Sequence, residues 1–494
     1  MDVRGRRLRK QSDDAVAFTS STTSDGRIAA HVVRINMAHA ASLVRSGAVD
    51  PVRGGQCLGF LLKYPPCPAL SPGTEDFHQQ LEQDAVDSLG VEVAGYVNLG
   101  KSRNDQVATA IRMELRERLL ELVGSLSELQ QTLLRTAENM GTVILPGFTH
   151  LQRAQPVTLA HYAFAYFDAF QRDIERLFEL YGRVNVSPMG SAALGGTNVP
   201  VDRRFVSKVL GFDGILGNAM DAVASRDVVV EALSCATIVM LNVSRMAEEQ
   251  VLWGSREFGF IELADQYSAS SSIMPQKKNP VVAEIARAKA GSVIGSMVSA
   301  CTIVKALPYA YNLDLQEVTP HLWSALDDAN ASVRLIGRSF SSVRYNRERI
   351  LDSIKGDYST ATALANHLAK GRGLTFREAH SVVGELVRSS EESGTPLEET
   401  AAKGLPVSSR GARRKLAIGL KEAKSVLDPA NFLRDISTEG GANPAFIPKE
   451  LETRRRTLGR DRTRLASLKS SLDSSERGLI RISRSMSKEV IARK

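Results

Sequence analysis

Residues 103–140 read RNDQVATAIRMELRERLLELVGSLSELQQTLLRTAENM, a stretch without proline. Its apolar residues recur at three- and four-residue spacing, at Val107, Ile111, Leu115, Leu119, Leu122, Leu126, Leu129 and Leu133. This spacing places them on one side of an α-helix of about ten turns. Because most globular helices are much shorter, the stretch predicts a fold that is built around long helices.

Four further stretches have the same helical period, at about 157–184, 221–254, 280–307 and 320–337. Long helices that pack side by side bury a shared apolar seam. We therefore expect an all-α fold with an elongated central long-helix bundle, in which nearly all of these leucines are core. Helices of this length also bury apolar faces between subunits, so the pattern favours a homo-oligomer.

The period breaks down toward both ends of the chain and predicts three parts. Residues 1–100 form an N-terminal helical domain, 101–355 the central bundle, and 356–494 a C-terminal helical domain with a basic tail. In the first part, the stretch 50–76 is rich in Gly, Pro and Cys, and we expect a loop or insertion there. After residue 356, short segments alternate with linkers that contain glycine.

The composition is that of an ordinary globular protein, with 43% hydrophobic and 24% charged residues. No apolar run approaches the roughly 18 residues of a membrane span, and the first residues lack the apolar core of a secretory signal. We therefore expect a cytoplasmic protein. The cysteines Cys57, Cys67, Cys235 and Cys301 form no CxxC pair, so neither a metal site nor a disulfide is predicted.

The net charge of +8 is concentrated at the two ends of the chain. Residues 453–494 carry a net charge of +9 and residues 1–10 carry +4, which leaves −5 for the rest. Because aromatic residues are not interleaved with these basic residues, solvated faces are the favoured interpretation and nucleic-acid binding is unlikely. RNA association through the tails stays a weak alternative.

Residues 268–280 read SASSSIMPQKKNP and have the composition of an anion-binding loop. Pro275 and Pro280 keep this segment out of regular helix. We expect Asn279 to cap a helix with Pro280 in its first turn, and a helix N-terminus favours negative charge. Hydroxyls, lysines and the helix end together predict a mobile loop that binds a carboxylate.

Two other polar segments lie at predicted helix ends. Residues 101–105, KSRND, follow Gly100 and open the first long helix, where they form either a second carboxylate cradle or a capping cluster with a surface arginine. His150 lies in GFTHLQRAQP, between two prolines, and is either an acid/base group or a structural histidine. Glu284, early in the next helix, is an acid/base partner or simply complements the helix dipole.

These residue types suit one reaction class. Two anion sites, a histidine, a mobile Ser/Lys loop and no metal or cofactor motif fit β-elimination from a dicarboxylic acid. A base removes a proton beside a carboxylate, and bound cations and N–H groups stabilise the charge that spreads onto its oxygens. An acid then protonates the departing nitrogen.

The segment 268–280 resembles the signature loop of the fumarase/aspartase superfamily, and its MPQKKNP resembles the form found in argininosuccinate lyases. Further blocks extend the resemblance over about residues 18–350: SSTTSDGRIAAHVVRINMAHA, KSRNDQVATAIRMELRE, GFTHLQRAQPVTLAHY, NAMDAVASRDVVVE and YNLDLQE. The resemblance implies reversible cleavage of argininosuccinate to arginine and fumarate without a cofactor. It also implies a homotetramer whose active sites take residues from three subunits.

The resemblance also implies roles for individual residues. Ser271 matches the proposed base, whose alkoxide Lys277 would stabilise, and His150 and Glu284 match the acid and its partner. Residues at substrate-binding positions are Ser21, Asp76, Arg103, Asn104, Thr149, Gln276, Asn279, Tyr311 and Gln316.

The chain departs from the family pattern at several positions. Ser270 stands where a glycine is usual, Asn98-Leu99 and Lys101 replace the His-Thr and Arg of HTGRSRND, and Thr319 replaces a lysine. Two alternatives therefore stay open: a lyase for another N-substituted aspartate, and a non-catalytic protein comparable to the lens crystallins of this family.

Overall fold

The proline-free stretch forms one helix, α7 (Arg103–Met140), as its spacing predicts. The computed structural model describes residues 11–66, 70, 73–409 and 412–491. The basic residues 1–10 and Cys67, for which the sequence also carries expectations, lie outside the described residues.

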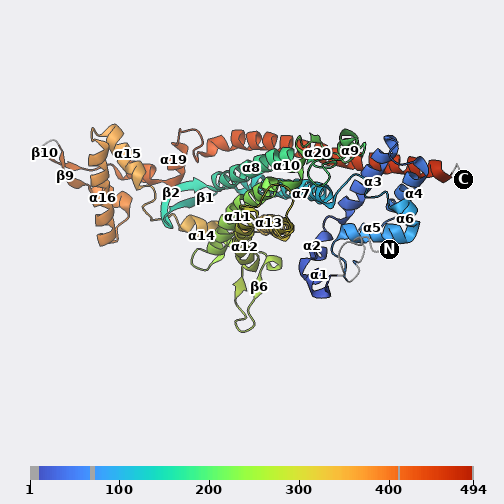
Figure 1. The fold of residues 1–494 in the computed structure, drawn as a ribbon. Helices are drawn as coiled ribbons and strands as arrows, with labels where there is room; N and C mark the ends of the chain where they lie inside the picture. The colour runs from blue at the N-terminus through green and yellow to red at the C-terminus, as the bar shows by residue number, and fades with distance from the viewer. Residues whose placement is uncertain (1–10, 67–69, 71–72, 410–411, 492–494) are drawn as a thin grey trace.

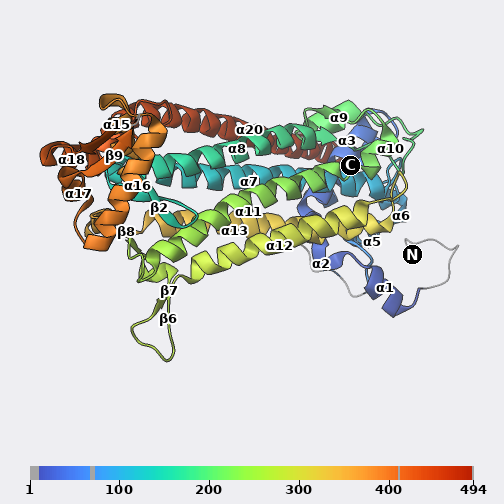
Figure 2. The ribbon, with the colours of Figure 1, turned by 90° about the vertical axis from the view of Figure 1, so that its left-hand side faces the viewer.

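Four more long helices run beside α7 (Figures 1 and 2). They are α8 (Leu159–Val184), α11 (Asp227–Gly254), α12 (Val281–Val304) and α13 (Val318–Ser341). Their buried side chains form the main core, which contains Leu119, Phe170, Val239 and Leu326. The all-α bundle is therefore confirmed. One expected helix is divided, because α10 (Ala219–Ala224) ends before Arg226 and α11 begins after it.

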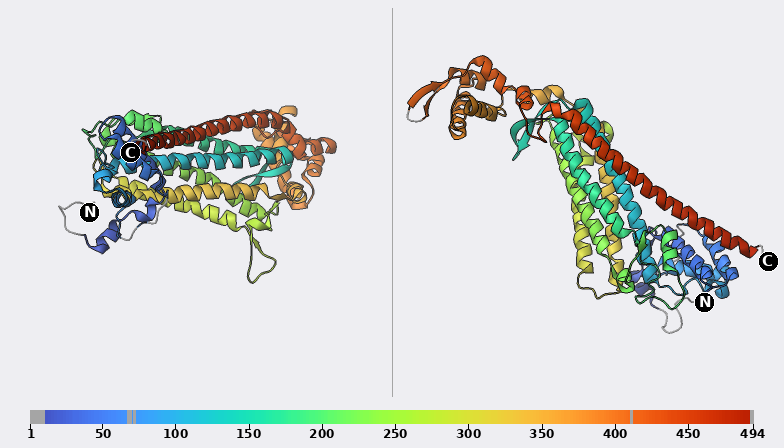
Figure 3. Two further views of the ribbon diagram at one scale, coloured as in Figure 1. Left: turned by 90° about the vertical axis from the view of Figure 1, so that its right-hand side faces the viewer. Right: turned by 90° about the horizontal axis from the view of Figure 1, so that it is seen from above.

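The basic C-terminal stretch is part of the bundle rather than a free tail. Its helix α20 (Ile447–Ile491) contacts α3, α4, α7 and α8 (Figure 3). A seven-residue repeat of Leu451, Leu458, Leu465, Leu472, Leu479 and Met486 faces the main core. Several of its arginines pair with acidic residues, as Arg454 does with Asp168 and Arg455 with Glu138.

The N-terminal segment consists of short helices that pack on one end of the bundle. These are α1 (Asp13–Thr19), α2 (Thr22–Asp25), α3 (Ala29–Arg45), α4 (Pro51–Leu61), α5 (Phe77–Leu89) and α6 (Val91–Ala94). The expectation of a loop over 50–76 was wrong for its first half, which forms α4. Asp50 caps this helix by accepting hydrogen bonds from the backbone N–H groups of Val52 and Arg53, and Pro51 occupies its first turn.

The C-terminal helices gather at the opposite end of the bundle from α1 and α2 (Figure 3). They are α14 (Arg347–Asp352), α15 (Ala361–Gly371), α16 (Phe376–Ser393), α17 (Leu397–Lys403), α18 (Leu420–Leu427) and α19 (Pro429–Arg434), with the hairpin of β9 (Leu405–Ser409) and β10 (Ala412–Leu416). Leu364, Leu368, Val383 and Leu386 belong to a separate small core. We keep the three parts 1–100, 101–355 and 356–494 as a proposal, with α20 lying along the central bundle.

The described residues of the central part contain only short two-stranded ladders. They pair β1 (Ile144–Thr149) with β2 (Gln152–Thr158), β3 (Val186–Ser187) with β4 (Gly214–Ile215), β5 (Ile261–Glu262) with β8 (Arg344–Tyr345), and β6 (Ala269–Ser270) with β7 (Lys278–Asn279). The remaining elements are α9 (Arg203–Val209), η1 (Asp265–Tyr267), η2 (Leu313–Gln316) and η3 (Pro444–Phe446). The ladders β1–β2 and β6–β7 hold predicted site residues in their turns.

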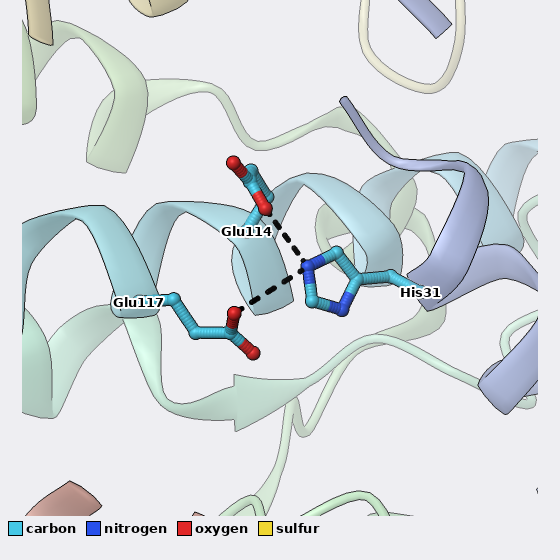
Figure 4. Close-up of side chains that lie close together, drawn as sticks. All are labelled: His31, Glu114 and Glu117. Carbon is cyan, nitrogen blue, oxygen red and sulfur yellow. Dashed lines mark hydrogen bonds and ion pairs between the residues drawn. The ribbon is translucent and has the colours of Figure 1, made fainter. Parts of the chain in front are cut away.

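A cluster of charged residues joins α3 to α7 (Figure 4). Nε2 of the buried His31 lies 2.9 Å from Oε2 of Glu114 and 4.0 Å from Oε2 of Glu117. Three such ligand atoms within 4.8 Å of one another are close enough to hold a metal ion. However, Arg118 donates to Glu114 at 2.6 Å, and Arg34 lies 3.7 Å from Glu117. Since these guanidinium groups already balance the carboxylates, we interpret the cluster as an ion-pair network.

The helix α11 is the one described helix that is long and apolar enough to cross a membrane, with a mean hydropathy of 1.6 over its most apolar window. It packs against α8, α12 and α13 within the bundle. We therefore interpret it as a core helix.

Candidate active site

A cavity of about 210 Å³ lies at the end of the bundle where α7 begins. Its walls come from α2, the turn before α5, the first turns of α7, η2 and α13. It brings together six of the predicted site residues: Ser21, Asp76, Arg103, Asn104, Tyr311 and Gln316. These residues come from four separate segments of the sequence, and the fold places them in one pocket.

The start of α7 is fixed by a capping box. The Ser102 side chain accepts a hydrogen bond from the Asn104 N–H, and the Asp105 side chain accepts one from the Ser102 N–H at 3.0 Å. The other Asp105 oxygen accepts from the N–H groups of Gly190 and Ala192 at 3.0 and 2.9 Å. These bonds fix the first turn of α7, so that Arg103 and Asn104 face the cavity.

Of the two alternatives for residues 101–105, the capping cluster is confirmed, because Ser102 and Asp105 form a cap that positions Arg103, whereas the carboxylate cradle stays a prediction. Nη1 of Arg103 donates to Asp76 at 2.9 Å and to Glu75 at 3.1 Å. The other carboxylate oxygen of Asp76 caps α5 by accepting from the Gln79 N–H at 2.7 Å. Arg103 is thus already neutralised before any ligand binds.

Four residues that were not among the predicted site residues also line the cavity: Asp25, Glu75, His78 and Arg226. Burial raises the pKa of Asp25 to about 6. Burial lowers the pKa of His78 to about 4, so its imidazole is neutral at pH 7. Burial also lowers the pKa of Arg226, to about 10, which leaves it charged. Glu75 and His78 lie on either side of Asp76 in the sequence, and Asp25 follows Ser21 by four residues, so proximity in sequence was an available signal.

His150 and Thr149 lie at the far end of α7, in the hairpin β1–β2. The two prolines around His150 favour an irregular segment before the helix, but Thr149 pairs with Gln152 across a two-residue turn. His150 and Leu151 form this turn with φ values of 55° and 58°. Such turns favour Asn and Gly at both positions, so the backbone at His150 is strained, as is common at functional sites. The imidazole is exposed.

The serine loop projects from the bundle at the tip of β6–β7 (Figure 2). The Ser271 hydroxyl oxygen accepts hydrogen bonds from the N–H groups of Ile273 at 3.3 Å and Met274 at 3.0 Å. Donors aimed at this oxygen would stabilise an alkoxide, which is what a serine base requires. Gln276 and Lys277 are exposed.

Two details of this loop differ from the expectation. Asn279 does not cap the following helix, because it pairs with Ala269 in the ladder and α12 begins only at Val281. The Lys278 ammonium lies 2.6 Å from Asp265 of η1, so it already has an ion-pair partner and is not a free cation of the loop. Ser270 pairs with Lys278, which shows that the ladder accommodates a side chain where glycine is usual. Glu284 is exposed in the first turn of α12.

The predicted site residues therefore form two groups that one chain does not bring together. Arg103 begins α7 and His150 follows its end, and 38 residues of helix span about 57 Å. Ser271 precedes α12 and Tyr311 follows it, and 24 residues span about 36 Å. Both hairpins lie toward the end of the bundle that carries the C-terminal helices, away from α2 and α5 (Figure 2).

Comparison with known proteins identifies a family. A family described as lyase matches residues 62–295, and one described as argininosuccinate lyase C-terminal matches residues 358–434. The argininosuccinate lyase of Methanoculleus marisnigri is 42% identical over 482 residues, with 96% of this chain and 97% of that protein covered. The argininosuccinate lyase of Methanosarcina barkeri is 39% identical over 482 residues, with 97% of each covered.

Solved structures agree with the fold. The crystal structure of EDDS lyase in complex with formate has a TM-score of 0.84 and 26% identity, and covers 94% of this chain and 93% of that chain. A class II fumarase from Schistosoma mansoni has a TM-score of 0.71 at 17% identity, covering 86% and 95%, and shares the fold. The chain is a lyase and belongs to the argininosuccinate lyase family of the fumarase/aspartase superfamily.

Proposed function

We propose that this protein catalyses the reversible cleavage of argininosuccinate to L-arginine and fumarate. The observation that carries the proposal is the identity of about 40% over nearly the whole chain with curated argininosuccinate lyases. The proposal includes a place in arginine biosynthesis and a cytoplasmic location, as expected from the sequence.

The proposed mechanism begins with Ser271 as the base. Its alkoxide, stabilised by the N–H groups of Ile273 and Met274 and by Lys277, removes a proton from the succinyl carbon beside a carboxylate. The electron pair spreads onto that carboxylate and then forms the double bond of fumarate as the carbon–nitrogen bond breaks. An acid that involves His150 and Glu284 protonates the guanidino nitrogen that leaves as arginine.

We further propose that the site is completed by other copies of the chain in a homotetramer. The two groups of site residues lie one helix length apart within a chain, as estimated above. Large apolar side chains are also exposed on α11, α12 and α13: Leu241, Ile285, Ile294, Val298 and Leu335. On α12 only five residues are buried although the helix is mostly apolar, which supports a face covered by a partner subunit.

The test of the function is the ultraviolet absorbance of fumarate that forms when the purified protein meets argininosuccinate. We expect turnover by the natural sequence, and a loss of about 100-fold or more in kcat for Ser271→Ala, the range for a general base. The variant should keep the mass and melting temperature of the parent, because Ser271 lies on a projecting loop. Ordinary turnover by Ser271→Ala would remove this residue from the mechanism.

A second candidate is a lyase for a different N-substituted aspartate. It is favoured by the similarity to EDDS lyase and by the departures at Lys101 and Thr319 near the pocket. The same assay separates the two candidates when adenylosuccinate and ethylenediamine disuccinate are run in parallel. Fumarate from one of these and none from argininosuccinate would overturn the first candidate, and no fumarate from any substrate would favour the non-catalytic alternative.

A further inference from the structure

The second half of α20 carries a row of cations that we call the basic stripe. It consists of exposed residues that have neither an ion pair nor a side-chain hydrogen bond among the described residues: Arg477, Arg481, Arg484 and Lys488. Their spacing of four, three and four residues places them within about 60° of one another around the helix. The stripe is about 16 Å long, at the rise of an α-helix.

The opposite face of the same turns packs on the protein. Leu479 and Met486 belong to or pack against the main core, and Ser483 is fully buried. This end of α20 lies against α4, where Ser487 meets Gly59 (Figure 3). The basic stripe therefore points away from the bundle and into solvent.

The first half of α20 is different, because its cations already have partners. Each of its arginines lies against a carboxylate, an amide oxygen or an aromatic ring: Arg454, Arg455, Arg456, Arg460, Arg462 and Arg464. The positive charge of this half is thus taken up within the protein. Only the second half offers several cations together to an outside partner.

Two carboxylates precede the basic stripe, and neither pairs with it. Glu476 pairs with Arg34 of α3 at 2.8 Å. Asp473 lies one turn before Arg477 and has no ion pair among the described residues. Outside its two basic ends the chain carries a net charge of −5, so a polyanion is attracted to this end of α20 and repelled by most of the remaining surface.

The chemistry of the basic stripe matches a row of phosphates. Its cations follow one another at about one helical turn, or about 5.4 Å, which is comparable to the step between successive phosphates of an extended strand. Three of the four are arginines, whose guanidinium group binds phosphate through two parallel hydrogen bonds. No aromatic residue occurs between residues 465 and 491, so this surface contacts the backbone and does not stack on bases.

We propose that the basic stripe binds the sugar–phosphate backbone of a nucleic acid, without regard to its base sequence. The amino-acid sequence favours a solvated face for the whole basic end. The structure divides this end into a half that is neutralised within the protein and a half that is open to a partner. The inference does not depend on the proposed function.

Fluorescence anisotropy of a labelled oligothymidylate tests this binding with the full chain. With an oligonucleotide of about 20 residues in about 50 mM NaCl, we expect a Kd below about 100 µM, as for non-specific binding. Four phosphate contacts predict that the affinity falls about 50-fold when NaCl is raised to about 200 mM.

A fourfold variant removes the basic stripe: Arg477→Gln, Arg481→Gln, Arg484→Gln and Lys488→Gln. It should weaken binding at least about 10-fold and flatten the salt dependence, because the phosphate contacts are lost. Since these side chains are exposed and unpaired, the melting temperature should not change.

The matched control removes the same charge from the first half of the same helix: Arg455→Gln, Arg456→Gln, Arg460→Gln and Arg462→Gln. These positions lie more than a Debye length from the basic stripe, so binding should weaken less than about 3-fold. Light scattering checks that both variants keep the mass of the parent. Equal weakening in the two variants would mean that net charge alone attracts the oligonucleotide, and would overturn the role of the stripe.

The natural sequence also decides the matter without a variant. Absence of binding in about 50 mM NaCl would overturn the proposal. A polyglutamate of the same length is run in parallel, and we expect it to bind more weakly. Equal affinity for polyglutamate would assign the basic stripe to an acidic protein and overturn the assignment to nucleic acid.

Discussion

The surroundings of Asp25 disfavour the ionised form of its carboxyl group. Burial is the main cause of its raised pKa, of about 6, and the nearby Asp76 adds to it. Between pH 4 and 6 the folded state therefore binds more protons than the unfolded state, whose pKa is near 3.8. The free energy of unfolding falls as the pH rises through this window and stays lowered above it.

Asp25→Asn should therefore stabilise the protein at neutral pH. The amide oxygen keeps the bonds from Ser21 and Phe77 without carrying a charge. At pH 8 we expect the free energy of unfolding to rise by about 1–3 kcal/mol, with the upper limit set by the size of the pKa shift. Melting temperatures between pH 4 and 8 should show this gain disappearing toward pH 4.

The exposed helix cap Asp50→Asn is the control for this pH series. Asn caps a helix as well as Asp, so this change should leave the melting temperature nearly constant at every pH. A lower melting temperature for Asp25→Asn at pH 8 would contradict the argument that its buried charge opposes folding.

Sequence motifs predicted only some of the residues that line this cavity. Ser21, Arg103 and Tyr311 were predicted because they stand in recognisable segments. Asp25 and Arg226 also stand in such segments, but they were not predicted, because their interest comes from burial and from the partners they lack, and tertiary packing decides both. A single sequence shows which residues carry charge, but not which charges lose contact with water.

Among the elements, α20 shows most clearly what periodicity contributes and what composition hides. The helices of the bundle were predicted from their apolar stripes. Residues 453–494 suggest a basic tail because their net charge of +9 outweighs a sparse apolar repeat. The leucine repeat that begins at Leu451 was the available signal, since one apolar residue in seven marks a narrow seam between helices.

Arg454 should be a main contact that holds α20 to the bundle. It donates to Asp168 of α8 at 2.9 and 2.6 Å, and its guanidinium lies 4.4 Å from the centre of the Phe164 ring. We expect Arg454→Ala to lower the free energy of unfolding by about 2 kcal/mol, as for a charged hydrogen bond with a cation–π contact.

Arg456→Ala is the matched change for this experiment. Arg456 lies on the same helix, is 78% exposed and, among the described residues, pairs only with Glu452 one turn away. Its loss should cost no more than about 0.5 kcal/mol. Chemical denaturation measures both variants, and equal effects would mean that the contact with α8 does not stabilise the docking of α20.

For the whole molecule, the central question is how two distant groups of residues meet. The cavity lined by Arg103 lies at one end of the long helices, and the serine loop lies at the other. Because these helices are continuous, bending within one chain does not bring the two ends together. A lyase site that contains both groups therefore requires more than one chain, and the exposed apolar residues of α12 provide a surface for that assembly. Light scattering should then give a mass of about four times 53.7 kDa.

Mixed oligomers test the shared site. Ser271→Ala and Arg103→Gln should each be inactive alone, because each lacks one group in every site. When the two are co-expressed, some sites receive Ser271 from one variant and Arg103 from the other. Each site needs Ser271 from one subunit and Arg103 from another. With random mixing, each of these two positions holds a chain with the required residue half of the time, so roughly a quarter of the natural activity should return.

The control pairs Ser271→Ala with Lys277→Ala. Both residues lie on one loop of one chain, so mixing cannot place both intact residues in the same site, and no activity should return. If Ser271→Ala and Arg103→Gln form mixed tetramers by mass and stay inactive, the site is not shared between chains. The loop would then have to reach the cavity of its own chain, which the length of α12 opposes.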